Sequence, residues 1–132
     1  MDDKDKLNFN EVKDSGQRTE FSTGARRDMQ AGKGLPHLIP TLFLRRLAKH
    51  FENGAVKYGK HNWRKGIPLS SYIDSSFRHW CAILEGLKDE DHASSVIWNM
   101  ACFIETVSMI EQGILPTELD DIGWFKDETP TK

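Results

Sequence analysis

Three successive runs of apolar residues recur at helical spacing between residues 41 and 113, and they constrain the fold more than any other feature of the sequence. Apolar residues three or four positions apart form one face of an α-helix. Gly59 and Pro68 break the chain after the first run, and Gly86 ends the second. We predict three helices, over about 41–57, from Ser70 or Ser71 to 86–88, and from an N-cap at Asp89 to Gly113.

The short connection between the second and third predicted helices requires them to run antiparallel. The third helix carries apolar residues over more than half of its circumference, so a single partner hairpin cannot cover it. No strand-like alternation and no internal repeat is present. The predicted fold class is therefore all-α, an antiparallel helical hairpin or bundle completed by oligomerisation. We expect a homo-oligomer, a dimer or a tetramer, built on a two-fold interface.

The regions outside the three helices differ in composition from the helical part. Residues 1–36 are polar and punctuated by glycine, which predicts an extended basic and polar arm. Residues 37–116 contain the helical domain. Residues 117–132 form an acidic tail that we expect to be loose, apart from three apolar side chains that dock on the domain. These are Ile122, Trp124 and Phe125.

The charge balance and the cysteines limit the classes of protein to consider. A net charge of -2 provides no basic excess for a nucleic-acid groove or an anionic membrane surface. No segment reaches the ~18 consecutive apolar residues of a membrane span. Cys81 and Cys102 lie in apolar stretches without metal-type spacing, which is typical of buried free thiols in a reducing compartment. We therefore expect a cytoplasmic protein that binds neither nucleic acid nor membrane.

Two histidines and four carboxylates crowd the end where the predicted hairpin closes. They are His79, Glu85, Asp89, Glu90, Asp91 and His92. Helical spacing brings Glu85 close to Asp89 and His92, and places His79 further along, towards the level of Ser95 and Asn99. Carboxylate oxygens suit a hard divalent ion, and acids at a helix corner repel one another unless a cation or solvent relieves them. The pattern predicts a metal site, and the alternative is a solvated turn.

Basic and amide side chains offer partners for a phosphorylated ligand. The loop after the first helix combines cations, aromatic rings and an amide, and loops on a helical scaffold often carry binding residues. Its candidates are Lys57, Tyr58, Asn62 and Trp63. A second basic segment, with Arg26, Arg27 and Lys33, would fold over phosphates or remain a solvated arm. Arg78 is a further cation, and Asn99 is either a base-reading amide or a buried one that sets helix register.

The order of these blocks resembles that of a known family. The resemblance covers about residues 24–114 and rests on Gly24 to Asp28, Lys33, Lys57 to Gly59, Asn62 and Trp63, Arg78 and His79, Asp89 to His92, and Trp98 and Asn99. These blocks are similar to the phage dATP/dGTP diphosphohydrolase family, the MazZ type, akin to the MazG-like all-α nucleotide pyrophosphohydrolases. The resemblance implies that 37–116 is a nucleotide-hydrolase domain that depends on a divalent metal, Mg, Mn or Co.

The same resemblance implies a substrate and a place in phage metabolism. The enzyme would hydrolyse a purine deoxynucleoside triphosphate, dGTP or else dATP, to the monophosphate and pyrophosphate. The dGMP would supply synthesis of the 2-aminoadenine nucleotide that replaces adenine in some phage DNA. If the chain is viral, it would work in the host cytoplasm.

The metal ligands expected from the resemblance differ from those of MazG-type enzymes. Those enzymes carry Glu-x-x-Glu on one helix and Glu-x-x-Asp on the next, where this chain has His79 and Ala82, then Asp89 and His92. The ligands that we predict are Glu52, Glu85, Asp89, Asp91 and His92, with Glu85, Asp89 and His79 as the catalytic residues. Imidazole in the ligand set favours a transition ion such as Mn²⁺ or Co²⁺.

The predicted reaction is attack of water on the α-phosphorus, with a carboxylate orienting the water. Phosphate charge would be neutralised by Arg26, Arg27, Lys33, Lys57 and Arg78, while Asn62, Trp63 and Asn99 read the sugar or base. Two alternatives remain open from the sequence. One is a hydrolase that releases triphosphate, although its His-Asp dipeptide is absent. The other is a non-catalytic phage helical protein that binds a nucleotide or a partner.

Overall fold

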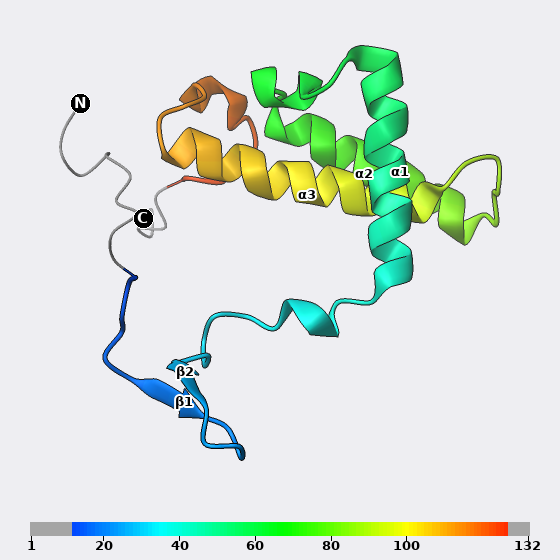
Figure 1. Cartoon of the computed structure of the whole chain (residues 1–132). Helices are drawn as coiled ribbons and strands as arrows, with labels where there is room; N and C mark the ends of the chain where they lie inside the picture. The colour runs from blue at the N-terminus through cyan, green and yellow to red at the C-terminus, as the bar shows by residue number, and fades with distance from the viewer. Residues whose placement is uncertain (1–11, 127–132) are drawn as a thin grey trace, which may run out of the picture. The chain divides into compact units, whose positions relative to one another are not determined.

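The computed structural model describes residues 12–126, which divide into two compact units between Ile39 and Pro40. The unit before this boundary contains a small β-sheet, and the unit after it contains three long helices (Figure 1). These helices are α1 (Thr41–Tyr58), α2 (Leu69–Leu84) and α3 (His92–Glu111). Within residues 12–126, three short 3₁₀ helices span Pro36–Leu38, Asn62–Lys65 and Thr117–Leu119. The predicted all-α class is confirmed for the helical unit.

The N-terminal unit holds an antiparallel pair of strands, β1 (Arg18–Glu20) and β2 (Arg26–Asp28). The prediction that this region has no strand was wrong, because each strand is too short for its side-chain alternation to be recognised. Asp28 at the end of β2 accepts hydrogen bonds from Ser15 and Lys33. The Ser15 hydroxyl and then the Lys33 ammonium lower the pKa of Asp28 to about 2.

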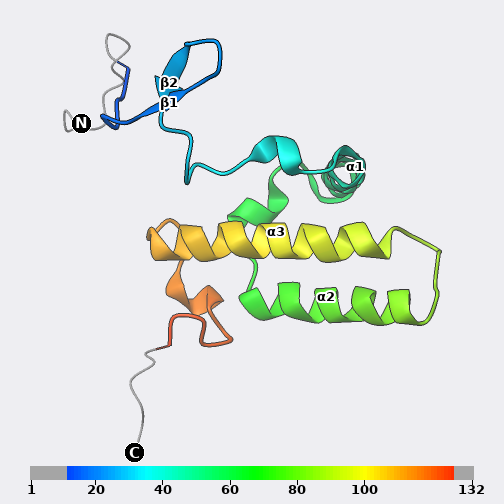
Figure 2. The ribbon, with the colours of Figure 1, turned by 90° about the horizontal axis from the view of Figure 1, so that it is seen from below.

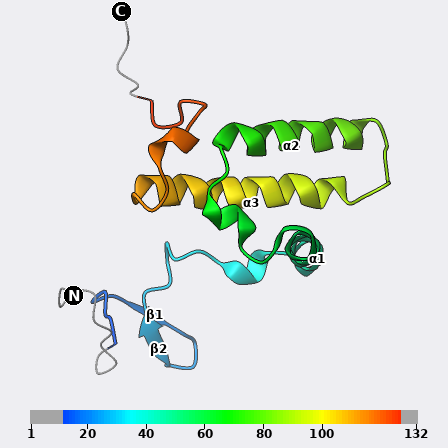
Figure 3. The same cartoon turned by 90° about the horizontal axis from the view of Figure 1, so that it is seen from above.

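In the helical unit, α2 and α3 lie side by side and run antiparallel, which confirms the predicted hairpin (Figures 2 and 3). Helix α1 crosses α3 on the side away from α2, as Figure 2 shows. Buried apolar side chains of α2 and α3 form the core, and a partly buried one of α1 packs against it. Helix α3 is therefore the element against which the other two helices pack.

Two helix starts differ from the sequence prediction. Helix α2 begins directly after Pro68, and no Ser70 or Ser71 hydroxyl caps it. Instead the Asp121 carboxylate, from the tail, accepts hydrogen bonds from the Ser70 N–H and hydroxyl. Helix α3 begins at His92, and its N-cap is Asp91 rather than Asp89. A cap from a distant segment cannot be recognised in a local sequence pattern.

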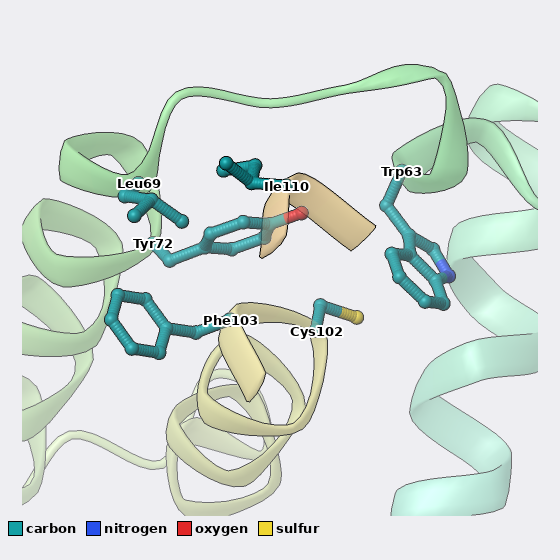
Figure 4. Packing of buried hydrophobic residues seen from close by; sticks show 6 residues of the cluster. All are labelled: Trp63, Leu69, Tyr72, Cys102, Phe103 and Ile110. Carbon is teal, nitrogen blue, oxygen red and sulfur yellow. The ribbon is translucent and has the colours of Figure 1, made fainter. Parts of the chain in front are cut away.

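The core lies where the start of α2 meets the second half of α3. Figure 4 shows its six most buried apolar side chains, Trp63, Leu69, Tyr72, Cys102, Phe103 and Ile110. The hydroxyl of Tyr72, which is only 1% exposed, lies 3.1 Å from the hydroxyl of Thr106, which is fully buried. Cys102 is buried as predicted, but Cys81 is exposed, because α2 turns that side away from α3.

The tail up to Lys126 contacts the helical unit, and residues 127–132 lie outside the described part of the chain. The Trp124 ring meets the Phe103 ring edge to face, with 5.2 Å between centroids. The Asp120 carboxylate accepts hydrogen bonds from the N–H groups of Trp124 and Phe125. Gly66 has a φ of +113°, and a Cβ there would lie 2.9 Å from Leu119. The loop before α2 therefore needs glycine where it meets the tail.

Helix α3 is long and apolar enough, by length and composition alone, to cross a membrane. Core helices of soluble proteins share this property, so it is weak evidence for a span. Several of its buried side chains are polar, which is costly in lipid without partners. These are His92, Ser94, Ser95, Asn99 and Thr106.

The buried pair of hydroxyls generates a stability prediction. Tyr72→Phe should lower the free energy of unfolding by about 1–3 kcal/mol, because it leaves the Thr106 hydroxyl buried without its partner. Urea unfolding followed by circular dichroism measures the change. The double variant Tyr72→Phe/Thr106→Val should recover part of the loss, because both polar groups are then removed. If the double variant loses more free energy of unfolding than the two single variants lose together, this account is contradicted.

Candidate active site

A polar cavity of about 470 Å³ lies between α1, α2 and α3. Its lining includes His50, Asn53 and Lys57 of α1, Ser75 and His79 of α2, and Glu90, Asp91, Ser95 and Asn99 from the start of α3 and the residues before it. Asn99 is buried and donates hydrogen bonds to the Ser75 hydroxyl and the Ser95 carbonyl, at 3.2 and 2.8 Å. The bond to Ser75 joins α3 to α2, and the bond to Ser95 lies within α3. Polar groups from all three helices thus converge on one space.

Two imidazoles and a carboxylate form a cluster at this cavity. His79 and Glu90 line it, and His92 lies beside them and lines a neighbouring cavity of about 430 Å³. The Nδ1 atoms of His79 and His92 are 2.9 Å apart. The Oε1 atom of Glu90 lies 3.5 Å from His79 Nδ1 and 3.9 Å from His92 Nδ1. The sequence placed His79 towards the level of Ser95 to Asn99 on α3. His79 lines the cavity with those two residues, and its ring also meets His92 at the start of α3. We call His79, Glu90 and His92 the imidazole–carboxylate cluster.

Asp89 determines which nitrogen of His92 faces the cluster. Its Oδ1 atom lies 2.8 Å from His92 Nε2, and this hydrogen bond is the main cause that lowers the pKa of Asp89. The ionised carboxylate only accepts, so Nε2 carries the hydrogen. The Nδ1 atom of His92 faces His79 and Glu90. Asp89 therefore orients His92 from behind, as carboxylates commonly do for metal-binding histidines.

Asp91 has a structural role at the base of the cavity. Its carboxylate caps α3 by accepting from the Ser94 N–H and hydroxyl. The same carboxylate pairs with Arg46 of α1, at 2.8 Å to Nε and 2.5 Å to Nη2. The Arg46 guanidinium is the main cause that holds the pKa of Asp91 far below its usual range. Asp91 thus stays ionised and joins α1 to the start of α3.

A third imidazole, His50 of α1, also borders the cavity. Its ring packs against Trp98 with 5.7 Å between centroids. Burial, and then the positive charge of His79, lowers the pKa of His50. His50 is therefore neutral at pH 7, with ring nitrogens available for hydrogen bonding.

The donor atoms of the imidazole–carboxylate cluster fit a divalent ion. One donor atom each from His79, Glu90 and His92 lies within 4.8 Å of the other two. Two imidazole nitrogens and one carboxylate oxygen favour Mn²⁺, Co²⁺ or Zn²⁺ more than an all-oxygen set would. A possible metal-binding group is thus present, without specifying the metal.

A second cavity, of about 580 Å³, lies on the other side of the same α1–α3 junction. Gly54, Tyr58 and Trp98 line both cavities, so the two spaces share a wall. The second one is bordered by aromatic and apolar groups together with a few polar ones. Its lining includes Phe51, His61, Asn62, Trp63, Arg64, Cys102 and Glu105. We call it the aromatic cavity.

The remaining predicted site residues lie in several places. Lys57, Tyr58 and Asn99 line the polar cavity, and Tyr58, Asn62 and Trp63 line the aromatic one. Glu85 is the exposed C-cap of α2, and Glu52 is exposed and paired with Lys49, so neither joins the imidazole–carboxylate cluster. Arg78 is exposed on α2. The N-terminal unit holds Arg26 and Arg27 in β2, and Lys33 paired with Asp28.

Three residues of the site were missing from the sequence prediction. Glu90 was treated only as part of an acidic run, yet its carboxylate lies within 4 Å of the Nδ1 atoms of both imidazoles, at 3.5 and 3.9 Å. His50 and Arg46 lie on α1 at positions that show no pattern in the sequence. The only available signal was helical spacing, which places His50, Asn53, Gly54 and Lys57 on one face of α1.

Comparison with known proteins identifies a family for most of the chain. Residues 23–113 match the family described as dATP/dGTP diphosphohydrolase, N-terminal. The matched segment includes all three helices and both cavities. No curated protein and no solved structure matches the chain.

The cluster geometry predicts where a divalent ion binds. His92→Ala should abolish binding of Mn²⁺ or Co²⁺ at micromolar concentrations, and Asp89→Asn should weaken it roughly 10- to 100-fold, because Asp89 only orients His92. Calorimetry and the visible absorption of bound Co²⁺ measure both effects. His37→Ala, an exposed histidine of the N-terminal unit, is the control.

Two further variants separate this site from the sequence-based ligand set. Glu52→Gln and Glu85→Gln should keep the affinity of the unmodified protein, because neither carboxylate belongs to the cluster. Loss of binding in either variant would restore Glu52 or Glu85 as a ligand and contradict the assignment of the site to the imidazole–carboxylate cluster.

Proposed function

Because the chain belongs to the dATP/dGTP diphosphohydrolase family, we propose that it hydrolyses a purine deoxynucleoside triphosphate to the monophosphate and pyrophosphate. Family membership makes it a (d)NTP diphosphohydrolase. The observation that carries the finer proposal is the pair of cavities that share Gly54, Tyr58 and Trp98. One cavity is polar and the other aromatic, which suits the two chemically different ends of a nucleotide.

The triphosphate would occupy the polar cavity. Lys57 supplies a cation there, and Asn53 supplies an amide that donates to phosphate oxygens. Lys57 would stabilise the negative charge that develops on the pyrophosphate as the bond from the α-phosphorus to its bridging oxygen breaks. Arg78, Arg26, Arg27 and Lys33 remain proposed phosphate ligands.

His79, Glu90 and His92 would hold a divalent ion beside the phosphates. When bound, the ion would polarise a phosphoryl oxygen and lower the pKa of the attacking water. Glu90 is half exposed, so its second oxygen can accept a hydrogen bond from that water and orient it. Asp89 would keep His92 in the required tautomer throughout. We retain Glu85 as a further proposed catalytic carboxylate.

The base would lie in the aromatic cavity. Trp63 and Phe51 provide ring faces on which a purine can stack, and Asn62 provides an amide for the base or sugar. Trp98 stands in the shared wall, where its ring also packs against Phe51 and Tyr72. A purine fills such a space better than a pyrimidine does. We propose dGTP as the first substrate and dATP as the second.

The biological setting is a further proposal. If the chain is viral, dGMP released in the host cytoplasm would supply synthesis of the 2-aminoadenine nucleotide. This step rests on the similarity to the phage enzymes described above.

We also propose that the chain forms a homo-oligomer through α2. Phe77, Trp80 and Leu84 project from one stripe of this helix and are 65%, 56% and 74% exposed. Contiguous exposed apolar side chains of this size mark an interaction surface. On α3, which was expected to form the interface, only Ile97 and Ile104 of the large apolar residues are exposed. The larger uncovered stripe is therefore on α2.

Product analysis tests the proposed reaction. Incubation with each deoxynucleoside triphosphate and Mg²⁺, Mn²⁺ or Co²⁺ should yield monophosphate and pyrophosphate from dGTP or dATP, separated by chromatography. Lys57→Met should lower kcat/KM roughly 10- to 100-fold, through loss of a charge-assisted contact to phosphate. Lys60→Met removes an exposed cation outside both cavity linings and is the matched control.

Other products would identify the alternatives. Release of inorganic triphosphate would indicate the triphosphate-releasing class, and nucleotide binding without any product would indicate a non-catalytic protein.

The assembly proposal has its own measurement. Light scattering coupled to size exclusion should report a dimer or tetramer for the unmodified chain and a smaller species for Phe77→Lys/Leu84→Lys, because charges disfavour a buried apolar interface. Val56→Lys changes an apolar residue of α1 that is 85% exposed and should leave the assembly unchanged. A monomeric unmodified chain would refute the proposal.

A further inference from the structure

The aromatic cavity contains a carboxylate that the proposed reaction does not use. Glu105 lies on α3 one and two turns beyond Cys102 and Trp98, which also line the cavity. Within residues 12–126 its carboxylate forms no hydrogen bond and no ion pair. Glu105 lines the aromatic cavity and not the polar one, where the proposed phosphate-binding groups lie. A free anion beside stacking surfaces is a candidate hydrogen-bond acceptor for a base.

Glu105 and Arg64 both line the aromatic cavity, and the charges of both affect the Cys102 thiol. Burial, and then the charge of Glu105, raise the pKa of the Cys102 thiol to about 12, and the charge of Arg64 opposes them. Both charges are therefore close to Cys102. The Arg64 guanidinium also stacks on the Trp63 ring, with 4.6 Å from Cζ to the centroid. A planar cation, a carboxylate and an aromatic face thus meet in one space.

These groups match the polar edges of guanine. Guanine presents two adjacent donors, N1–H and the 2-amino group, and two acceptors, O6 and N7. A carboxylate accepts from the two donors together, and an arginine donates to the two acceptors. Adenine has no 2-amino group, and its N1 is an acceptor that a carboxylate repels. A site built to bond a donor rejects an analogue that lacks it, because its own polar group is left without a partner.

We propose that Glu105 makes the aromatic cavity selective for guanine over adenine by accepting hydrogen bonds from N1–H and the 2-amino group. The inference rests on the proposed function, since it requires that the base of a nucleotide substrate lies in this cavity. Arg64 binds the O6 and N7 edge of the same base. Glu105 is thus a specificity-determining residue.

Steady-state kinetics with three substrates tests this role. Glu105→Gln should lower kcat/KM for dGTP roughly 10- to 100-fold and change that for dATP less than about threefold, because only guanine loses charge-assisted bonds. In the unmodified enzyme, dITP lacks the 2-amino group and should fall between dGTP and dATP. Glu111→Gln, an exposed glutamate near the end of α3, is the control for removing a charge from this helix.

Equal losses for dGTP and dATP, or no change for either, would overturn the proposal. The dITP comparison uses the unmodified enzyme. It therefore tests the proposal even if circular dichroism shows that Glu105→Gln is poorly folded. Equal kcat/KM values for dITP and dGTP would rule out a contact between the enzyme and the 2-amino group.

A binding measurement separates this inference from the proposed function. Quenching of tryptophan fluorescence by the α,β-methylene analogues of dGTP and dATP reports binding without turnover. If no triphosphate is hydrolysed but Glu105→Gln abolishes the preference for the dGTP analogue, the proposed function fails and the inference stands. If the monophosphate forms but the preference is unchanged by Glu105→Gln, the function stands and the inference fails.

Discussion

The carboxylate of Asp91 holds the site together, because it caps α3 and pairs with Arg46 of α1 at the same time. A cap determines where a helix starts, and the start of α3 determines which of its residues faces α2. Because Arg46 binds the same carboxylate, it holds α1 against the start of α3. The position of the polar cavity between three helices therefore depends on one ionised side chain, and so does the placement of His92 beside the His79 and Glu90 side chains that line this cavity.

The junction of α1 and α3 separates two kinds of chemistry. Tyr58 and Trp98 line both cavities, so a ligand that reaches across them contacts imidazoles and carboxylates at one end and aromatic rings at the other. Phosphoryl transfer requires mainly positioning and charge stabilisation, whereas base selection requires stacking and a few directed hydrogen bonds. A small helical unit can provide both because its crossing helices present different faces on the two sides of the junction.

Much of the fold followed from local patterns. The three helices, the antiparallel hairpin and the loop between Gly59 and Pro68 were predictable, since apolar periodicity and helix-breaking residues act over a few positions. The strands β1 and β2 were missed because three residues are too few for an alternating pattern. The capping of α2 by Asp121 was missed because its partner lies in the tail, far along the chain.

The sequence by itself determined that helices would form here and that acids and histidines would gather where the hairpin closes, because both depend on spacing along one chain. Only the tertiary structure decided how those groups are used. Asp89 lies behind His92, Asp91 binds Arg46, and Glu90 faces the two imidazoles, although the three acids are consecutive. Neighbouring residues in a turn point in different directions, and their partners come from other helices, so register and packing decide which acid meets which group.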